Sequence, residues 1–100
     1  MTVEKEKNGD SLIVKINGSV DANTAGELRG ELIDELDDVR LVHFHMEEMD
    51  YISSAGLRVI MEVYQTLEEK DGTVVLERVR EEVKDIFERT GFADFMEMRD

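Results

Sequence analysis

Two adjacent serines, Ser53 and Ser54, carry the most distinctive chemistry of this sequence. They stand between an acidic stretch, residues 47–50, and a segment in which apolar residues recur at helical spacing. Ser54 is expected to be the N-cap of that helix, close to unpaired backbone N–H groups and to the positive end of the helix dipole. A phosphate ester is electrostatically tolerated there, yet it adds about −1.5 to −2 charges to a surface loop. The position therefore suits a covalent switch, although a serine at a helix start also serves simply as a cap.

The elements that must position these serines follow from the spacing of apolar residues. Residues 39–46 are expected to form a central strand that ends at the acidic stretch. From Ser54 to about Lys70, apolar side chains repeat at intervals of three and four, which indicates an amphipathic helix. Near the start of the chain, Asn8-Gly9 predicts a two-residue hairpin between a charged edge strand, residues 2–7, and a half-buried strand that follows it.

Two further helices and one strand complete the pattern. The tetrapeptide Thr-Ala-Gly-Glu at residues 24–27 matches a capping box, so a helix is expected to begin there and to bury one apolar face. Gly26 and Gly30 are expected to permit the close approach of a second helix. Residues 73–79 predict a strand, and residues 80–90 predict the last helix.

The resulting order, β-β-α-β-α-β-α, predicts an α/β fold. Because helices alternate with the later strands, a small, mostly parallel sheet is expected, with an N-terminal antiparallel edge strand. Polar residues mark one side of the strands, so helices are expected mainly on the other face. Phe95, Met96 and Met98 are expected to form a final apolar tail against the core. The polar strand positions are Lys15, Asn17, His43, His45, Thr73 and Glu77.

Composition restricts the class of protein. One hundred residues, 41% of them apolar, are expected to form a single domain, residues 1–100, with one modest core. The sequence has no cysteine, no recognisable signal peptide and no apolar run long enough for a membrane span, so a cytoplasmic location is expected. The formal net charge of −13 argues against nucleic acid and membrane surfaces as partners, and it favours a basic protein partner.

The sequence carries no recognisable catalytic or cofactor-binding motif. It has no glycine-rich phosphate loop and no Ser-His-Asp order with supporting motifs. His43 and His45 share a strand face without an evident third ligand, and residues 47–50 lack the spacing of a calcium loop. A nucleophilic Ser54 would need a general base, and no histidine adjoins it in sequence. We therefore expect no enzyme activity, no cofactor and no metal.

Three motifs in order resemble the signatures of STAS domains, as found in bacterial anti-sigma factor antagonists. Residues 17–25, Asn-Gly-Ser-Val-Asp-Ala-Asn-Thr-Ala, resemble the first, in which a strand leads to a Thr-Ala helix start. Residues 49–57, Met-Asp-Tyr-Ile-Ser-Ser-Ala-Gly-Leu, resemble the phosphorylation loop, and Thr90-Gly91-Phe92 resembles the close of the last helix. The three motifs span essentially the whole chain, which makes the match specific.

The resemblance implies the STAS fold and a partner-switching function in transcription regulation. In the family, the unphosphorylated domain binds an anti-sigma factor of the serine-kinase type and thereby frees a sigma factor. The anti-sigma factor uses ATP and magnesium to phosphorylate the serine two residues before the loop glycine, and a PP2C-type phosphatase removes the phosphate. Carried onto this chain, the acceptor is Ser54, two residues before Gly56, with Ser53 as the alternative. Ser53 stands where the family frequently has Asp, and Asp21 matches the acidic residue beside the acceptor.

Two loops are expected to form the partner surface. Both leave the same end of parallel strands, so residues 18–24 and 51–58 should lie side by side. Met49 and Tyr51 are expected to flank the hydroxyl as apolar anchors, and Gly56 is expected to keep the backbone accessible. The expected partner-binding residues are Asp21, Asn23, Thr24, Met49, Tyr51, Ser53, Ser54, Gly56 and Arg58.

A second interpretation keeps the fold and discards the switch. The resemblance also extends to STAS domains that serve as regulatory subunits of lipid-transport and stress-sensing complexes, a role that needs no phosphorylated serine. A neighbouring gene for an anti-sigma kinase would favour the switch, whereas an ABC-transporter operon would favour this alternative.

Overall fold

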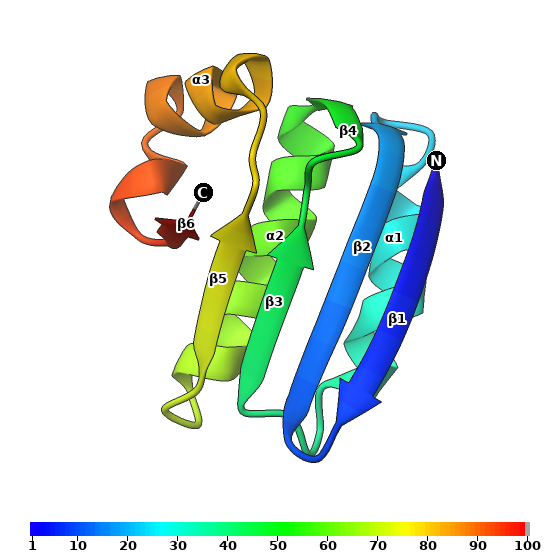
Figure 1. Ribbon diagram of the computed structural model, residues 1–100, viewed down its shortest axis with the longest axis vertical. Helices are drawn as coiled ribbons and strands as arrows, with labels where there is room; N and C mark the ends of the chain where they lie inside the picture. Colours follow the sequence, from blue (N-terminus) through cyan, green and yellow to red (C-terminus); the bar gives the residue numbers. More distant parts are fainter. Residues whose placement is uncertain (100) are drawn as a thin grey trace.

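A twisted sheet of six strands organises the chain in the computed structural model, which describes residues 1–99 (Figure 1). The hydrogen-bonded order is β1-β2-β3-β5-β6, and the short β4 pairs with β2 beyond the end of β3. Only β1 runs antiparallel to its neighbour, so the prediction of a mostly parallel sheet with an antiparallel edge is confirmed. The strands are β1 (Thr2–Asn8), β2 (Ser11–Val20), β3 (Leu41–His45), β4 (Met49–Ile52), β5 (Thr73–Glu77) and β6 (Glu97–Arg99).

Two helices cover one face of this sheet, as the polar pattern of the strands predicts (Figure 1). They are α1 (Ala25–Leu32), which continues into a 3-10 turn η1 (Ile33–Glu35), and α2 (Ser54–Glu68). The third helix, α3 (Glu81–Arg89), packs against β4 at the end of the sheet and is followed by a 3-10 turn η2 (Phe92–Asp94). No helix among residues 1–99 combines the length and the apolar character needed to cross a bilayer.

The core lies between the sheet and the helices. On β2, the alternating residues Leu12, Val14 and Ile16 are fully buried, whereas Ile13 and Lys15 on the other face are only half-buried. This alternation has the period of two that one covered face requires. The largest fully buried side chains are Phe44, Phe87, Leu12, Ile16, Leu28, Leu32, Leu36, Met46, Met49, Ile52, Leu57 and Ile60.

Two strands were not predicted from the sequence, and the omission of each has a physical reason. β4 was expected to be a loop because its pattern is not alternating: Met49 and Ile52 are buried while the two residues between them are exposed. β6 has only three residues and holds its place by parallel pairing with β5. Short strands of this kind depend on a neighbour's hydrogen bonds rather than on their own composition.

Three local predictions need correction. The hairpin exists, but Asn8 pairs with Ser11, so its two loop residues are Gly9 and Asp10, with Gly9 at a φ of 62°. Gly26 and Gly30 do not mediate helix packing, because both are exposed and a Cβ added to either meets no atom within 4 Å. The expected apolar tail is only partly formed: Met96 is buried, but Phe95 is 59% exposed.

Candidate partner-binding and phosphorylation site

Ser53, not Ser54, is the N-cap of α2. Its backbone is extended, with φ −88° and ψ 173°, and its Oγ accepts a hydrogen bond of 3.2 Å from the backbone N–H of Gly56. The expectation that Ser54 caps the helix is therefore wrong by one residue. The chain leaves β4 in an extended conformation through Ser53, and this conformation is the one that an N-cap residue needs.

Ser54 is the first helical residue and is exposed. Its hydroxyl has no hydrogen-bond partner among residues 1–99, whereas the Ser53 hydroxyl is committed to the helix. The backbone N–H groups of the first helical turn and the helix dipole favour negative charge at this end of α2. The two neighbouring serines thus differ clearly: one stabilises the helix start, and the other presents a free hydroxyl to solvent.

Pairing between β2 and β4 brings the second loop to the serines. Ser19 pairs with Tyr51 and Val20 with Ile52, and the backbone N–H of Ser53 donates a 2.8 Å hydrogen bond to the carbonyl of Val20. The loop that follows Val20 therefore starts directly beside the serines. This placement agrees with the predicted juxtaposition of the two loops, and β4 is the element that produces it.

Asp21 and Thr24 give that second loop a defined shape. The Asp21 Oδ1 accepts hydrogen bonds from the backbone N–H groups of Asn23, at 2.9 Å, and Thr24, at 3.1 Å. The Thr24 Oγ1 accepts from the backbone N–H of Asp21, at 2.9 Å, and donates to the carbonyl of Ser19, at 3.1 Å. The hydrogen bond from Asn23, supported by those from Thr24, lowers the pKa of Asp21 below its ordinary value of 3.8. The carboxylate is therefore ionised at neutral pH.

The capping box predicted at residues 24–27 does not form. Thr24 is the N-cap residue of α1 by position, but its side chain makes no capping hydrogen bond to the helix. Its hydroxyl is engaged with Asp21 and Ser19 instead. The threonine stabilises the loop rather than the first turn of the helix, because a side-chain oxygen turned toward the loop cannot also face that turn.

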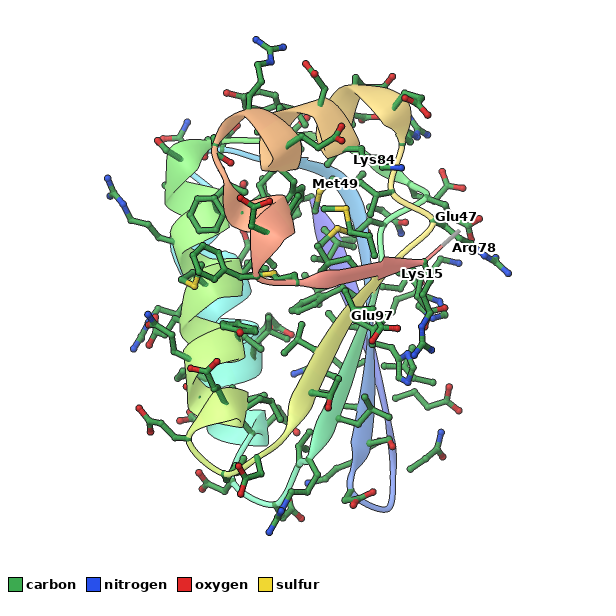
Figure 2. The ribbon with its side chains drawn as sticks, turned by 90° about the vertical axis from the view of Figure 1, so that its left-hand side faces the viewer. Lys15, Glu47, Met49, Arg78, Lys84 and Glu97 are labelled. Carbon is green, nitrogen blue, oxygen red and sulfur yellow. The ribbon has the colours of Figure 1, made fainter. Side chains whose placement is uncertain are left out.

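Two of the predicted surface residues are buried. Met49 is 0% exposed and points into the core beneath α3, so it is not available as a partner anchor (Figure 2). Gly56 is also buried: a Cβ built on it would lie 2.7 Å from the Cγ1 of Ile52 and 2.8 Å from the Cγ1 of Val20. Gly56 thus allows α2 to pack closely against β2 and β4, rather than keeping the backbone open.

The other predicted residues are accessible. Tyr51 is 47% exposed, and Asn23 and Arg58 are exposed as well. Arg58 forms no ion pair within the part of the chain that the structure describes. It lies one helical turn after Ser54, on the same side of α2. The exposed members of the set therefore lie on the two adjacent loops and on the first turns of α2.

The acidic stretch before the serines is tied to the segment that precedes α3. Arg80 donates from Nε to the carbonyl of Glu47, at 2.7 Å, and from Nη1 to the Oδ1 of Asp50, at 3.0 Å. Arg78 adds an ion pair of 3.4 Å with Glu47 (Figure 2). The pairing of residues 47–50 with these arginines was not predicted, since nothing in the linear sequence connects them.

The two histidines lie on the uncovered face of the sheet, away from the serines. Nδ1 of His43 contacts Oε1 of Glu77, and Nε2 of His45 lies 3.6 Å from the other carboxylate oxygen of Glu77. Neither imidazole is thus placed as a general base for Ser54. Within residues 1–99, no group of three or more His, Cys, Asp or Glu side chains has a metal-binding arrangement.

A family model identifies the class to which this fold and site belong. The model of the STAS domain matches residues 2–100, so the chain belongs to the STAS domain family. BtrV of Bordetella bronchiseptica, which is assigned as an anti-sigma factor antagonist, is 36% identical over 93 residues. That alignment covers 92% of this chain and 80% of BtrV. The family membership marks this chain as a regulatory binding protein rather than an enzyme.

Solved structures share the architecture. A Thermotoga maritima protein assigned to the same class superposes with a TM-score of 0.89 at 16% identity, covering 98% of this chain and 86% of that one. The Bacillus cell fate determinant SpoIIAA in its phosphorylated form superposes with a TM-score of 0.77 at 15% identity, covering 97% and 90%. At identities this low, the structural similarity shows a common fold and nothing further.

Proposed function

We propose that this protein is an anti-sigma factor antagonist that binds its anti-sigma factor around Ser54 and is switched off when Ser54 is phosphorylated. The observation that carries the proposal is the exposed Ser54 hydroxyl, which has no hydrogen-bond partner among residues 1–99 and stands at the first position of α2. Relatives named anti-sigma factor antagonists support the choice of partner. Such a partner acts on transcription, so the interaction belongs in the cytoplasm.

The partner-binding residues form one surface, here called the switch surface. Its exposed members lie on the two loops and on the first turns of α2, and the loop after β2 is held by the Asp21 and Thr24 hydrogen bonds. A loop with a fixed shape loses little conformational freedom when a partner binds, which favours affinity. The switch surface consists of Asp21, Asn23, Thr24, Tyr51, Ser54 and Arg58, with Ser53 and Gly56 supporting it from behind.

Phosphorylation is compatible with the fold and incompatible with a partner shaped for a neutral hydroxyl. The start of α2 tolerates the new negative charge, so the domain remains folded. A partner that presses on the Ser54 hydroxyl must instead accommodate a bulky dianion beside the ionised Asp21. A loss of about 3 to 4 kcal/mol corresponds to a several-hundred-fold loss of affinity, which is enough to exchange partners.

The chemistry of the switch is assigned to the partners. No histidine of this chain is placed as a base for Ser54, which fits a kinase that brings its own base. The anti-sigma factor is accordingly proposed to be of the serine-kinase type, transferring the γ-phosphoryl group of ATP to the Ser54 Oγ with release of ADP. A PP2C-type phosphatase is proposed to hydrolyse the phosphoserine and restore binding.

The test is to incubate the purified protein with its cognate anti-sigma kinase, ATP and magnesium, and to locate phosphate by mass spectrometry. Stoichiometric phosphate on Ser54 is expected in the wild-type protein, and none in Ser54→Ala. Ser53→Ala is the matched control and should still be phosphorylated, because its neighbour keeps the free hydroxyl. A chain that binds the kinase but gains no phosphate at either serine would refute the switch.

A further inference from the structure

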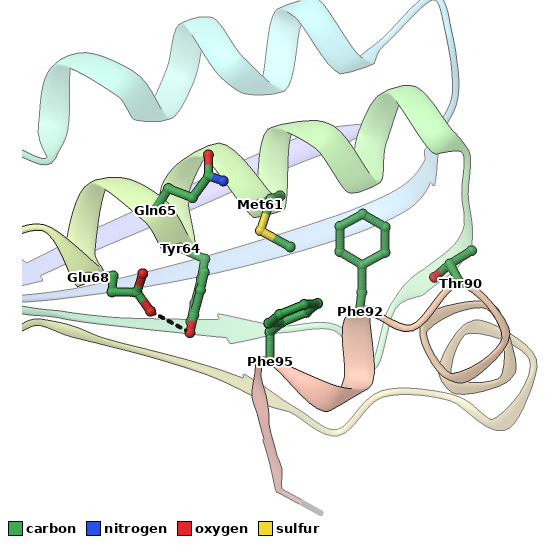
Figure 3. A pocket seen from close by; sticks show the side chains of 7 residues that line it. All are labelled: Met61, Tyr64, Gln65, Glu68, Thr90, Phe92 and Phe95. Carbon is green, nitrogen blue, oxygen red and sulfur yellow. Dashed lines mark hydrogen bonds between the residues drawn. The ribbon is translucent and has the colours of Figure 1, made fainter.

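An apolar groove lies between α2 and the η2 segment, apart from the serines (Figure 3). Its volume is about 400 Å³, and six of its seven lining side chains are uncharged. Phe95 projects into solvent at its edge with 59% of its surface exposed. The lining residues are Met61, Tyr64, Gln65, Glu68, Thr90, Phe92 and Phe95.

The groove has a defined interior. The rings of Tyr64 and Phe95 form a tilted aromatic pair in its wall, with centroids 6.5 Å apart and planes inclined at 55°. The Tyr64 hydroxyl donates a 2.8 Å hydrogen bond to the Oε2 of Glu68, which raises the pKa of Tyr64. The second oxygen of Glu68 accepts no hydrogen bond within residues 1–99. One free carboxylate oxygen thus marks the rim of an otherwise apolar site.

The groove and Ser54 share one face of α2. Positions 54, 58, 61, 65 and 68 follow intervals of three and four, so they form a single stripe along the helix. All five are exposed or half-buried. With a rise of about 1.5 Å per residue, Met61 lies roughly 10 Å along the axis from Ser54, and Glu68 roughly 21 Å. A protein that covers Ser54 and continues along α2 reaches the groove.

Charge along this stripe defines what can occupy it. Arg58, near the serine end, forms no ion pair within residues 1–99, and Glu68 at the far end has a free oxygen. These opposite charges are separated by about 15 Å of helix, with the apolar groove between them. A complementary segment therefore carries an acidic group, then a bulky apolar side chain, then Lys or Arg, in that order.

We propose that the groove is a second anchor point of the anti-sigma factor, which packs a bulky apolar side chain into the groove against Tyr64 and Phe95 and pairs a Lys or Arg with Glu68. This inference rests on the proposed function and extends its interface to a named site. Buried aromatic anchors of this kind carry a large share of the binding energy in protein interfaces. Phosphorylation controls the serine end, and the groove contributes affinity and orientation.

The test measures the affinity of the unphosphorylated protein for the purified anti-sigma kinase by calorimetric titration. Phe95→Ala should weaken binding at least tenfold, and Glu68→Gln about three- to tenfold. Phe95→Leu, which keeps apolar bulk, should retain most of the affinity. Glu4→Gln removes one negative charge from exposed β1 and should bind like the wild type. Thermal unfolding of each variant confirms that these exposed substitutions leave the fold intact.

The outcomes separate the two proposals. Wild-type affinity in both Phe95→Ala and Glu68→Gln, with Ser54 still phosphorylated by the kinase, overturns the groove and leaves the proposed function standing. Failure of the wild-type protein to bind the kinase overturns both. A dimer detected by sedimentation that is lost in Phe95→Ala, with unchanged affinity for the kinase, overturns the groove assignment in favour of a second copy of the chain.

Discussion

The backbone N–H of Ser53 donates a 2.8 Å hydrogen bond to the carbonyl of Val20. This bond extends the pairing of β2 with β4 to the last residue before α2. Because of it, the loop shaped by Asp21 and the start of the helix form one surface, although they are more than 30 positions apart in sequence. Ser54, the next residue, is held at a fixed place on that surface.

Replacing the two serines separately should show that Ser53 contributes to the stability of the fold and that Ser54 does not. Ser53→Ala removes the oxygen that caps the Gly56 N–H, so we expect a loss of about 1 kcal/mol in the free energy of unfolding. Ser54→Ala removes an exposed hydroxyl without a partner and should change that free energy by less than about 0.5 kcal/mol. Urea unfolding at neutral pH measures both. Equal losses in the two variants would contradict the assignment of Ser53 as the cap.

Two glycine-to-alanine substitutions in helices should have opposite effects. In Gly56→Ala, the new methyl group clashes with Ile52 and Val20, so we expect destabilisation of about 1–3 kcal/mol. In Gly30→Ala, the methyl group meets no atom within 4 Å, so the better helix propensity should stabilise the protein by up to about 1 kcal/mol. Thermal and urea unfolding compare the pair. A Gly56→Ala protein as stable as the wild type would mean that α2 does not pack as closely against β2 and β4 as described.

A negative charge at position 54 should weaken the partner interaction without unfolding the domain. Ser54→Asp supplies one charge of the two on a phosphate, at a helix start that favours it. We expect an affinity for the anti-sigma factor at least about tenfold lower than that of the wild type, with an unchanged or slightly raised melting temperature. Ser54→Asn, of nearly the same size, is the neutral control and should bind more tightly than Ser54→Asp.

The Asp21 carboxylate should make stability depend on pH in a defined direction. Hydrogen bonds from Asn23 and Thr24 lower its pKa in the folded state, so its contribution is present above the ordinary value of 3.8 and is lost as the pH falls through the lowered value. Asp21→Asn keeps an acceptor oxygen but does not titrate there. The wild type should therefore be more stable than Asp21→Asn at pH 7, and the difference should shrink toward pH 3. Urea unfolding at both pH values gives this difference. A difference in stability between the wild type and Asp21→Asn that widens as the pH falls would contradict this prediction.

Much of the candidate site could be predicted from the sequence, because its signals are local. Amphipathic periodicity located α2, and the polar strand residues predicted which face of the sheet stays uncovered. The predicted nearness of the two loops followed from parallel strands ending at one edge. The fold class follows from the order of the elements alone, since short connections and right-handed crossovers leave few arrangements.

The errors concern residues whose surroundings come from distant parts of the chain. Met49 looked like a surface anchor beside acidic residues, yet it is fully buried in β4, which packs against α3. Gly56 looked like an accessible backbone position, yet Ile52 and Val20 pack against it. Burial depends on which elements meet in three dimensions, and a short linear window contains no information about them.

By itself, the sequence determined the type and order of the elements, the acidic surface and a serine pair at a helix start, because periodicity, charge and capping chemistry act over a few neighbouring residues. Only the tertiary structure decided which serine caps and which is free, and that α2 and η2 enclose a groove lined by Tyr64 and Phe95. Those outcomes depend on strand pairing and on side chains far apart in sequence, whose energies exist only once the chain has folded.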